Sequence, residues 1–365
     1  MLCNAGALVG FHADLAARLA AKGAELTESD WAAMPPAASA EALAFVKVWA
    51  RQAVAVAEGR AALREAVEPD SAFVSFCHRL MSSRLPDSQT AARRWLETHF
   101  QPHHILTEAP GGMGFLTGYY EPEVPGTLQP ASRASTALRA RPADLGTLVP
   151  YPSRREIEAR APTPGEAVVY VTDRAEAFLI QVQGSARVVL PDGRRLRLTY
   201  AGRNGRPYTS IGRLLIESGA IAERDMSLAT LKHWLRHAGL SEGEAGAVLL
   251  QRNESFVFFA IDDSLPDSAG PVGGAGLPLV PLVSIAVDRT LFSYGLPFII
   301  EAELPWRSPQ PEPFQKLMLA QDTGSAIVGP ARADIFFGTG AGAGARAGDI
   351  RHPARFSVLL PKGLA

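Results

Sequence analysis

The spacing of apolar positions changes along the chain, and the changes divide it into regions. In RRLRLTY (194–200), Leu196, Leu198 and Tyr200 alternate with polar residues, which is the period of a half-buried strand. Other short runs rich in β-branched and aromatic residues also predict strands. They are MGFLTGYYEPE (113–123), AVVYVTD (167–173), AFLIQVQG (177–184), ARVVL (186–190), SFVFFAID (255–262), SIAVD (284–288), LPFIIEAEL (296–304), KLMLA (316–320), ADIFF (333–337) and FSVLLP (356–361).

Helices are expected in two other regions. Residues 11–100 favour helix, with one long alanine-rich helix at 40–67 and another at 91–100 that Asp87 or Ser88 could cap. Residues 210–251 predict three shorter helices, with Gly219 and Gly239 as stop signals.

The turns between the strands indicate the fold class. Pro191-Asp192-Gly193 is typical of a hairpin turn, and the stretches 265–281 and 306–314 are rich in glycine and proline, as surface loops are. Short strands with such turns predict a barrel or a sandwich rather than a doubly wound parallel sheet. The length of 365 residues allows one large domain or two ordinary ones.

Composition and charge exclude some classes of protein. The chain is 47% hydrophobic and 20% charged, which indicates a globular protein. Its formal net charge of -1 gives no reason to expect nucleic acid or an anionic membrane as a partner. The first twenty residues show no complete signal peptide or transmembrane span. Cys3 is interpreted as an ordinary small residue, with the remnant of a lipoprotein signal as the alternative.

Three motifs suggest chemistry that the rest of the sequence does not support. Asp322-Thr323-Gly324-Ser325 resembles the catalytic turn of an aspartic protease, but no second Asp-Thr/Ser-Gly supplies the partner carboxylate. The stretch GTGAGAGARAG (338–348) is interpreted as a flexible turn, because it fits a nucleotide-binding fingerprint poorly. His233 and His237 have helical metal-ligand spacing without a third ligand, so no metal site and no cofactor are predicted.

The remaining candidates are carboxylates near turns and polar or aromatic residues suited to sugars. The carboxylates are Glu121, Asp288, Asp322 and Asp334. Taken singly, each is better explained by hydrogen bonds to its own backbone than by a role in chemistry. Aromatic faces and planar amides suit the rings and hydroxyls of a glycan. Residues of these kinds include Tyr119, Tyr120, Gln183, Asn204 and Tyr208.

Seven segments, in their order along the chain, resemble the bacterial lytic murein transglycosylases of the MltA type. They are GYYEPE (118–123), YPSRREIE (151–158), AFLIQVQGSARVVLPDG (177–193), YAGRNGRPYTSIGRLLIESG (200–219), NESFVFF (253–259), SIAVDR (284–289) and QDTGSAIVGPARADIFFGTG (321–340). The resemblance implies a mainly β protein with α-helices. Residues 1–117 and 247–365 would form a double-psi β-barrel domain with N-terminal helices. A smaller inserted β-barrel would span 118–246, with the substrate groove between the domains.

The resemblance also implies an activity. The enzyme would cleave the β-1,4 bond between N-acetylmuramic acid and N-acetylglucosamine in peptidoglycan, and would leave a 1,6-anhydromuramoyl end. By motif matching, Asp334 takes the place of the catalytic acid/base, and Asp288 and Asp322 are supporting residues. We expect substrate contacts from Tyr119, Tyr120, Glu121, Gln183, Gly184, Ser185, Asn204, Tyr208 and Ser210.

A single carboxyl group suffices for this chemistry, because the sugar's own 6-hydroxyl is the nucleophile. The aromatic pair Phe336-Phe337 beside Asp334 would raise the pKa of its carboxyl group. Two alternatives stay open at this point: a hydrolase that uses two carboxylates, and a glycan-binding barrel without catalysis. The substrate implies the periplasm, with outer-membrane association if a lipid anchor is present, and we expect a monomer.

Overall fold

The computed structural model describes residues 5–363. They form two compact units. Unit 1 comprises Met1–Tyr119, Val272–Gly338 and Asp349–Ala365, and unit 2 comprises Tyr120–Pro271 and Thr339–Gly348. Cys3, which was considered as a lipid attachment site, lies outside the described residues. No helix in the described part of the chain is long and apolar enough to span a membrane.

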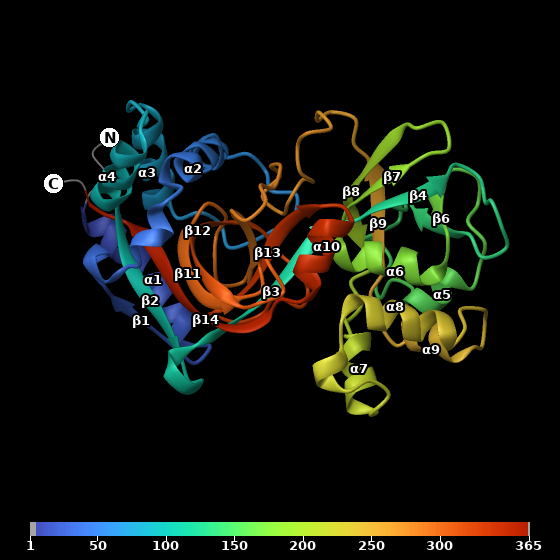
Figure 1. Cartoon of the computed structure of the whole chain (residues 1–365). Helices are drawn as coiled ribbons and strands as arrows, with labels where there is room; N and C mark the ends of the chain where they lie inside the picture. Colours follow the sequence, from blue (N-terminus) through green and yellow to red (C-terminus); the bar gives the residue numbers. More distant parts are fainter. Residues whose placement is uncertain (1–4, 364–365) are drawn as a thin grey trace. The chain divides into compact units, whose positions relative to one another are not determined.

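Unit 1 contains a sheet with the strand order β1-β2-β14-β11-β12-β10-β13-β3. Strand β3 also pairs with β14, so the six strands from β14 to β3 close on themselves and curve around a common core (Figure 1). This closure agrees with the predicted barrel, whereas the double-psi crossing stays a prediction. The strands are β1 (Ala24–Glu28), β2 (Phe100–Thr107), β3 (Gly114–Glu121), β10 (Ser284–Val287), β11 (Pro297–Leu304), β12 (Glu312–Asp322), β13 (Arg332–Thr339) and β14 (Arg351–Pro361).

Helices form a second core in unit 1 around the buried Trp49. Its ring lies 5.2 Å from Trp95, 5.6 Å from Phe100 and 6.3 Å from Phe76, measured between centroids. These edge-on contacts join helices to the first residue of β2. The elements are α1 (Ala5–Ala20), η1 (Trp31–Ala33), η2 (Pro36–Ser39), α2 (Ala42–Ala57), α3 (Ser71–Met81), α4 (Gln89–His99) and η3 (Pro110–Gly112).

Unit 2 contains a sheet with the order β5-β6-β4-β7-β8-β9. An isolated bridge between Ala140 and Phe259 connects the two ends of this order. The predicted hairpin joins β7 to β8, and Gly193 provides the positive φ of 85° that its turn needs. The strands are β4 (Glu123–Thr127), β5 (Thr136–Arg139), β6 (Ala167–Val171), β7 (Ala186–Val189), β8 (Arg195–Arg203) and β9 (Val257–Ile261).

The helices of unit 2 correct two of the predictions. They are α5 (Arg154–Glu158), α6 (Arg174–Gln183), α7 (Ile211–Glu217), η4 (Glu223–Asp225), α8 (Leu228–His237), α9 (Ala245–Gln251) and α10 (Ala341–Gly348). AFLIQVQ, predicted as a strand, is most of α6. This helix packs against apolar residues on two sides, so its sequence lacks a polar face. The glycine-rich stretch is a helix rather than a turn: Tyr120 packs on Gly344, where a Cβ would come within 2.7 Å of its ring.

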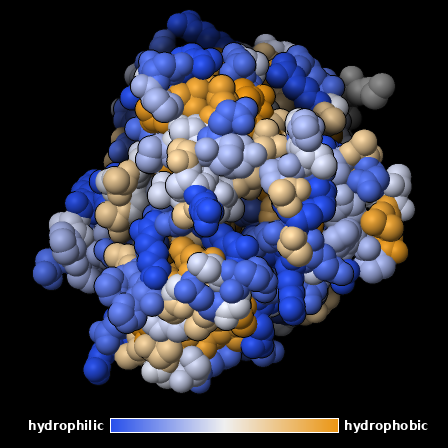
Figure 2. Space-filling view, turned by 90° about the vertical axis from the view of Figure 1, so that its right-hand side faces the viewer, coloured by the Kyte–Doolittle hydropathy of each residue, from blue (hydrophilic) through white to orange (hydrophobic). Residues whose placement is uncertain are grey.

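Further predicted limits differ from those of the structure. The long helix expected at 40–67 ends at Ala57, because Gly59 has a positive φ of 62°. The region 11–100, which was predicted to be helical, also contains strand β1, and strand β2 begins at its last residue. The second unit also continues past residue 246, because β9 hydrogen-bonds to β8. Figure 2 shows a mainly hydrophilic surface on which hydrophobic side chains gather in separate patches.

Candidate active site

Three side-chain pairs lie along one face of the neighbouring strands β3 and β13. Phe115 packs under the guanidinium of Arg332 at 5.6 Å, and the rings of Tyr119 and Phe336 lie 5.4 Å apart. Between these pairs, the hydroxyl of Thr117 donates a hydrogen bond of 2.6 Å to Oδ1 of Asp334. All three pairs have the same separation of 217 positions, as two strands that run the same way require. Because side chains alternate between faces, this face carries every second residue of each strand.

The carboxyl group of Asp334 lies in surroundings that favour its neutral form. Burial raises its pKa to about 6, and the charge of Asp322 acts in the same direction. The Arg332 cation and the Thr117 hydrogen bond oppose this effect without cancelling it. The residue is nevertheless only half-buried. The structure thus combines partial exposure with a carboxyl group that is protonated in part of its population near neutral pH.

Asp322 is held very differently. It is buried at the end of β12, where Oδ2 accepts a 2.9 Å hydrogen bond from the hydroxyl of Tyr119. Oδ1 accepts backbone N–H bonds of 2.8 Å from Gly274 and Thr323. Arg64 lies 3.5 Å from the same oxygen. These partners hold the side chain of Asp322 between several chain segments of unit 1.

Asp288 is also buried, and both of its carboxylate oxygens accept hydrogen bonds from nearby residues. Oδ1 accepts hydrogen bonds from the backbone and hydroxyl of Thr290, at 2.9 and 2.7 Å. Oδ2 accepts a 2.7 Å bond from the N–H of Gly329, in the loop that leads to β13. Asp288 therefore fixes the loop before the strand that carries Asp334.

The remaining predicted site residue of unit 1, Tyr119, belongs to a core cluster with Leu279, Ala286, Ile327 and Phe336. Its hydroxyl is engaged by Asp322, and burial raises the pKa of that hydroxyl well above its usual value. Tyr119 thus supports the site through packing, in agreement with the ordinary interpretation of a buried tyrosine.

In unit 2, the structure brings together Tyr120, Glu121 and the end of α6. The backbone N–H of Tyr120 donates to the side-chain oxygen of Gln183 at 3.1 Å. Helix α6 then ends at Gly184, which has a left-handed φ of 82°, and the chain continues through the buried Ser185. Glu121 is completely buried and pairs with Arg187 at 2.8 Å. The hydroxyl of Thr339 donates to the same carboxylate at 2.7 Å.

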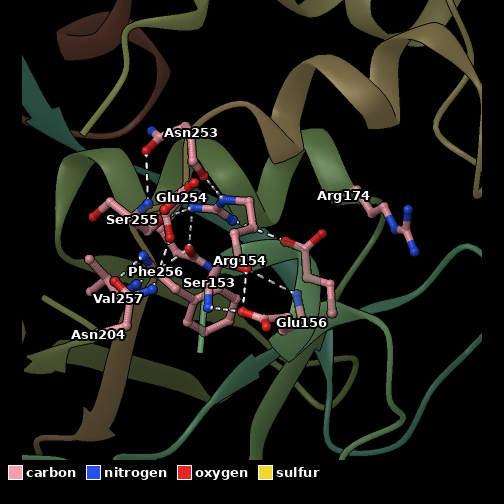
Figure 3. A network of polar contacts seen from close by, with 12 residues as sticks. Ser153, Arg154, Glu156, Arg174, Asn204, Asn253, Glu254, Ser255, Phe256 and Val257 are labelled. Atoms are coloured by element: carbon pink, nitrogen blue, oxygen red, sulfur yellow. Dashed lines mark hydrogen bonds and ion pairs between the residues drawn. The ribbon is translucent and has the colours of Figure 1, made fainter. Parts of the chain in front are cut away.

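The predicted residue Asn204 lies in a polar network with the fully buried Arg154 (Figure 3). Arg154 donates to the backbone oxygens of Asn253 and Ser255 and to the side chain of Gln181. Asn204 donates to the carbonyl oxygens of Pro152 and Glu254, and its own oxygen accepts from the N–H of Phe256.

The predicted residues Asn204 and Ser210 both have hydrogen-bond partners within the fold. The side-chain groups of Asn204 are bonded within the protein, which favours a structural role. Ser210 caps α7 by accepting a bond from the N–H of Arg213, at 3.3 Å. Tyr208 is half-buried and lies near Arg154; burial lowers the pKa of the Arg154 guanidinium, and Glu158 and the Tyr208 phenol act against that shift.

Sequence reasoning missed Thr117 and Arg332, the two residues that set the environment of Asp334. Nη2 of Arg332 donates to the Thr117 hydroxyl at 2.8 Å, and that hydroxyl donates to Asp334. The alternation of side chains along a strand could have indicated them. Arg332 stands two positions before Asp334 and Thr117 stands two before Tyr119, so each pair lies on one face of its strand. What the sequence did not show is that β3 and β13 are neighbours, although 217 positions separate the paired residues.

In residues 5–363, no three side chains of His, Cys, Asp or Glu are grouped so that they could hold a metal ion. His233 and His237 lie on α8 with their rings stacked 6.2 Å apart. In the QDTGS segment, Asp322 ends a strand rather than facing a second catalytic aspartate, as its bonds to Tyr119 and Gly274 show.

Comparison with known proteins gives matches over most of the chain. The model of the MltA specific insert domain matches residues 115–260, and that of the 3D domain matches residues 283–360. Membrane-bound lytic murein transglycosylase A of Escherichia coli K12 is 36% identical over 249 residues, which are 67% of this chain and 65% of that protein. The alignment therefore spans less than two thirds of that relative's length.

Solved structures extend the similarity. The crystal structure of a membrane-bound lytic murein transglycosylase from Agrobacterium tumefaciens has a TM-score of 0.78 and 31% identity. The match covers 92% of this chain and 97% of that one. E. coli MltA with bound chitohexaose has a TM-score of 0.69 and 27% identity, with 93% and 95% of the two chains covered. From the domain models, the identity and the shared fold, it follows that the chain belongs to the MltA family.

Proposed function

We propose that the protein is a lytic transglycosylase, which cleaves the β-1,4 bond between N-acetylmuramic acid and N-acetylglucosamine in peptidoglycan. The observation that carries the proposal is the contrast among the three aspartates. Asp288 and Asp322 are fixed by several donors each, whereas Asp334 is partly exposed with a pKa raised to about 6. The names of the relatives, which are lytic murein transglycosylases, support the same activity.

The proposed first step is protonation of the leaving oxygen. Asp334 gives its proton to O4 of N-acetylglucosamine as the bond from that oxygen to C1 of the muramoyl sugar breaks. Positive charge develops at C1 and the ring oxygen, as in other glycosidic cleavages. Asp334 is then ionised, and the Thr117 hydroxyl that donates to Oδ1 stabilises the new charge.

The second step closes the ring without water. The 6-hydroxyl of the same sugar attacks C1, and Asp334 takes the hydroxyl proton back. The carboxyl group returns to its initial state, and the product carries a 1,6-anhydro bond. Because the nucleophile is part of the substrate, no second carboxylate is needed to activate water. This agrees with the engagement of Asp322 by Tyr119, Gly274, Thr323 and Arg64.

The products of digested murein sacculi test this function. We expect anhydromuropeptides, lighter by one water than hydrolysed products, with no heavy oxygen incorporated from labelled water. A two-carboxylate hydrolase would instead release reducing ends that carry the label. A glycan-binding protein without catalysis would bind sacculi and release nothing soluble. The Asp334→Asn variant is the control, and release of anhydromuropeptides at the wild-type rate would refute the assignment of Asp334.

Substrate contacts and location follow from this activity as further proposals. Tyr120, Gln183, Gly184, Ser185, Tyr208 and Ser210 are retained as candidates for the glycan site, whereas Tyr119, Glu121 and Asn204 are assigned to support of the fold. Peptidoglycan strands are the proposed partner, and their location places the enzyme in the periplasm. We also expect a monomer, and association with the outer membrane if a lipid anchor is present.

A further inference from the structure

A cavity of about 660 Å³ lies in unit 1, close to Thr117 and Asp334. Its wall includes Met113, Phe115, Val328, Arg332 and Pro353. Phe115 and Val328 are 44% and 66% exposed, so an apolar surface faces solvent here. None of the described hydrogen bonds or core clusters engages the side chain of Val328.

The wall of this cavity continues the face that carries Asp334. Arg332 stands two residues before Asp334 on β13, and Phe115 stands two residues before Thr117 on β3. Two residues of a strand span about 7 Å. The wall of the cavity therefore begins at the side chains next to Asp334 and Thr117 on the same face of the sheet. A group attached to the sugar at the cleaved bond would therefore be within reach of the cavity.

The lining indicates what kind of group fits. It has one cationic side chain, Arg332, and no aspartate or glutamate. The hydroxyl of Thr107 is already bonded, because it donates to the carbonyl of Met113 at 2.5 Å and accepts from the N–H of Ala109. A sugar ring buried there would leave several hydroxyls without partners, which is costly. Small aliphatic groups that carry a carboxylate fit the lining better.

We propose that this cavity receives the peptide stem of the substrate, a role that rests on the proposed function. The stem begins at the lactyl group of the muramoyl sugar, the sugar whose C1 is attacked. Its first residues offer an alanine methyl group and the free carboxylate of a γ-linked glutamate. The methyl groups would pack against Phe115 and Val328, and the carboxylate would face Arg332. The two observed hydrogen bonds of Arg332 use two of its five N–H donors.

Charge reversal at Val328 tests the proposal, because this exposed side chain has little packing to lose. Val328→Asp would repel the stem carboxylates and Val328→Lys would attract them. We expect kcat/KM on peptide-bearing strands to fall about threefold for the first variant and to rise about threefold for the second. Both variants should cleave strands stripped of peptide by an amidase at the wild-type rate. High salt should reduce the difference between the variants.

The other outcomes separate this proposal from the proposed function. Equal effects of Val328→Asp on both substrates would indicate that the cavity holds sugar, and would overturn the stem assignment. The absence of any effect would overturn it too. If the wild type releases no anhydro product from either substrate, the proposed function fails. In that case, the stem proposal is tested by the binding of soluble strands to the Asp334→Asn protein. Adding Val328→Asp to that protein should weaken the binding of peptide-bearing strands and leave the binding of stripped strands unchanged.

Discussion

Asp322 and Asp334 occupy corresponding places on two strands, yet the protein treats them in opposite ways. Strand β10 lies between β12 and β13, and Ala286 is in register with Asp322 on one side and with Asp334 on the other. Asp322 receives a phenol, two backbone N–H groups and a nearby arginine. Asp334 receives one hydroxyl, while burial holds its pKa at about 6.

The two carboxyl groups thus differ in the number of donors aimed at them, although their positions in the sheet correspond. Donors aimed at an ionised group favour its charged form, which cannot protonate a leaving oxygen. A carboxyl group with few donors in apolar surroundings keeps its proton at a higher pH. Substitution of Asp334 should therefore affect mainly activity, whereas substitution of Asp322 or Asp288 should affect mainly stability. Removal of the donor Thr117 should change the pH dependence of activity.

The largest expected effect is that of Asp334→Asn on catalysis. The amide has nearly the same shape but cannot transfer the proton, so we expect the rate of anhydromuropeptide release to fall about 10²- to 10⁴-fold. Initial rates on sacculi measure the loss. A rate within a factor of a few of wild type would show that another group is the acid.

The same variant should have the opposite effect on stability. The pKa of Asp334 is raised in the folded protein, so its contribution to stability is present at low pH and is lost as the pH rises through about 6. Asp334→Asn cannot ionise. Its Tm relative to wild type should thus increase between pH 5 and pH 8, and a constant difference would contradict the raised pKa.

Asp322→Ala should reverse this pattern, with a large loss of stability. The substitution removes the acceptor of the Tyr119 hydroxyl and of two backbone N–H groups, and it removes the carboxylate that lies beside Arg64. We expect the free energy of unfolding to fall by about 3–5 kcal/mol, as when one partner of a buried ion pair is removed. Urea unfolding measures it. Folded Asp322→Ala protein should keep far more activity per molecule than Asp334→Asn, and equal losses of activity would contradict the proposed division of roles.

Asp288→Ala should cost less, about 1–3 kcal/mol, because it removes hydrogen bonds to Thr290 and Gly329 but no ion pair. Urea unfolding beside the Asp322→Ala protein gives the comparison. The conservative Asp288→Asn variant, which keeps an acceptor oxygen, is the control and should lose less. A loss larger than that of Asp322→Ala would show that the loop before β13 contributes more than its bonds suggest.

The sequence predicted the family, the mainly β class with helices and the candidate acid, because ordered motifs and strand periods are local signals. It did not predict that AFLIQVQ is helical, since α6 is buried on two sides and has no polar face to reveal its period. Nor did it predict the roles of Thr117 and Arg332, which depend on the pairing of β3 with β13. The distinction between Asp322 and Asp334 likewise required the positions of donors from distant segments.

The smallest expected effect concerns the single donor of Asp334. Thr117→Val keeps the side-chain volume but removes the hydroxyl that favours the ionised carboxylate, so the pKa of Asp334 should rise further. The descending limb of the kcat/KM profile should then move to higher pH by about 0.5 to 1 unit. Thr117→Ser keeps the hydroxyl and should retain the wild-type profile. A purely structural role would lower activity at every pH without moving the limb, so an unmoved limb would place the control of the carboxyl group with burial and Arg332 alone.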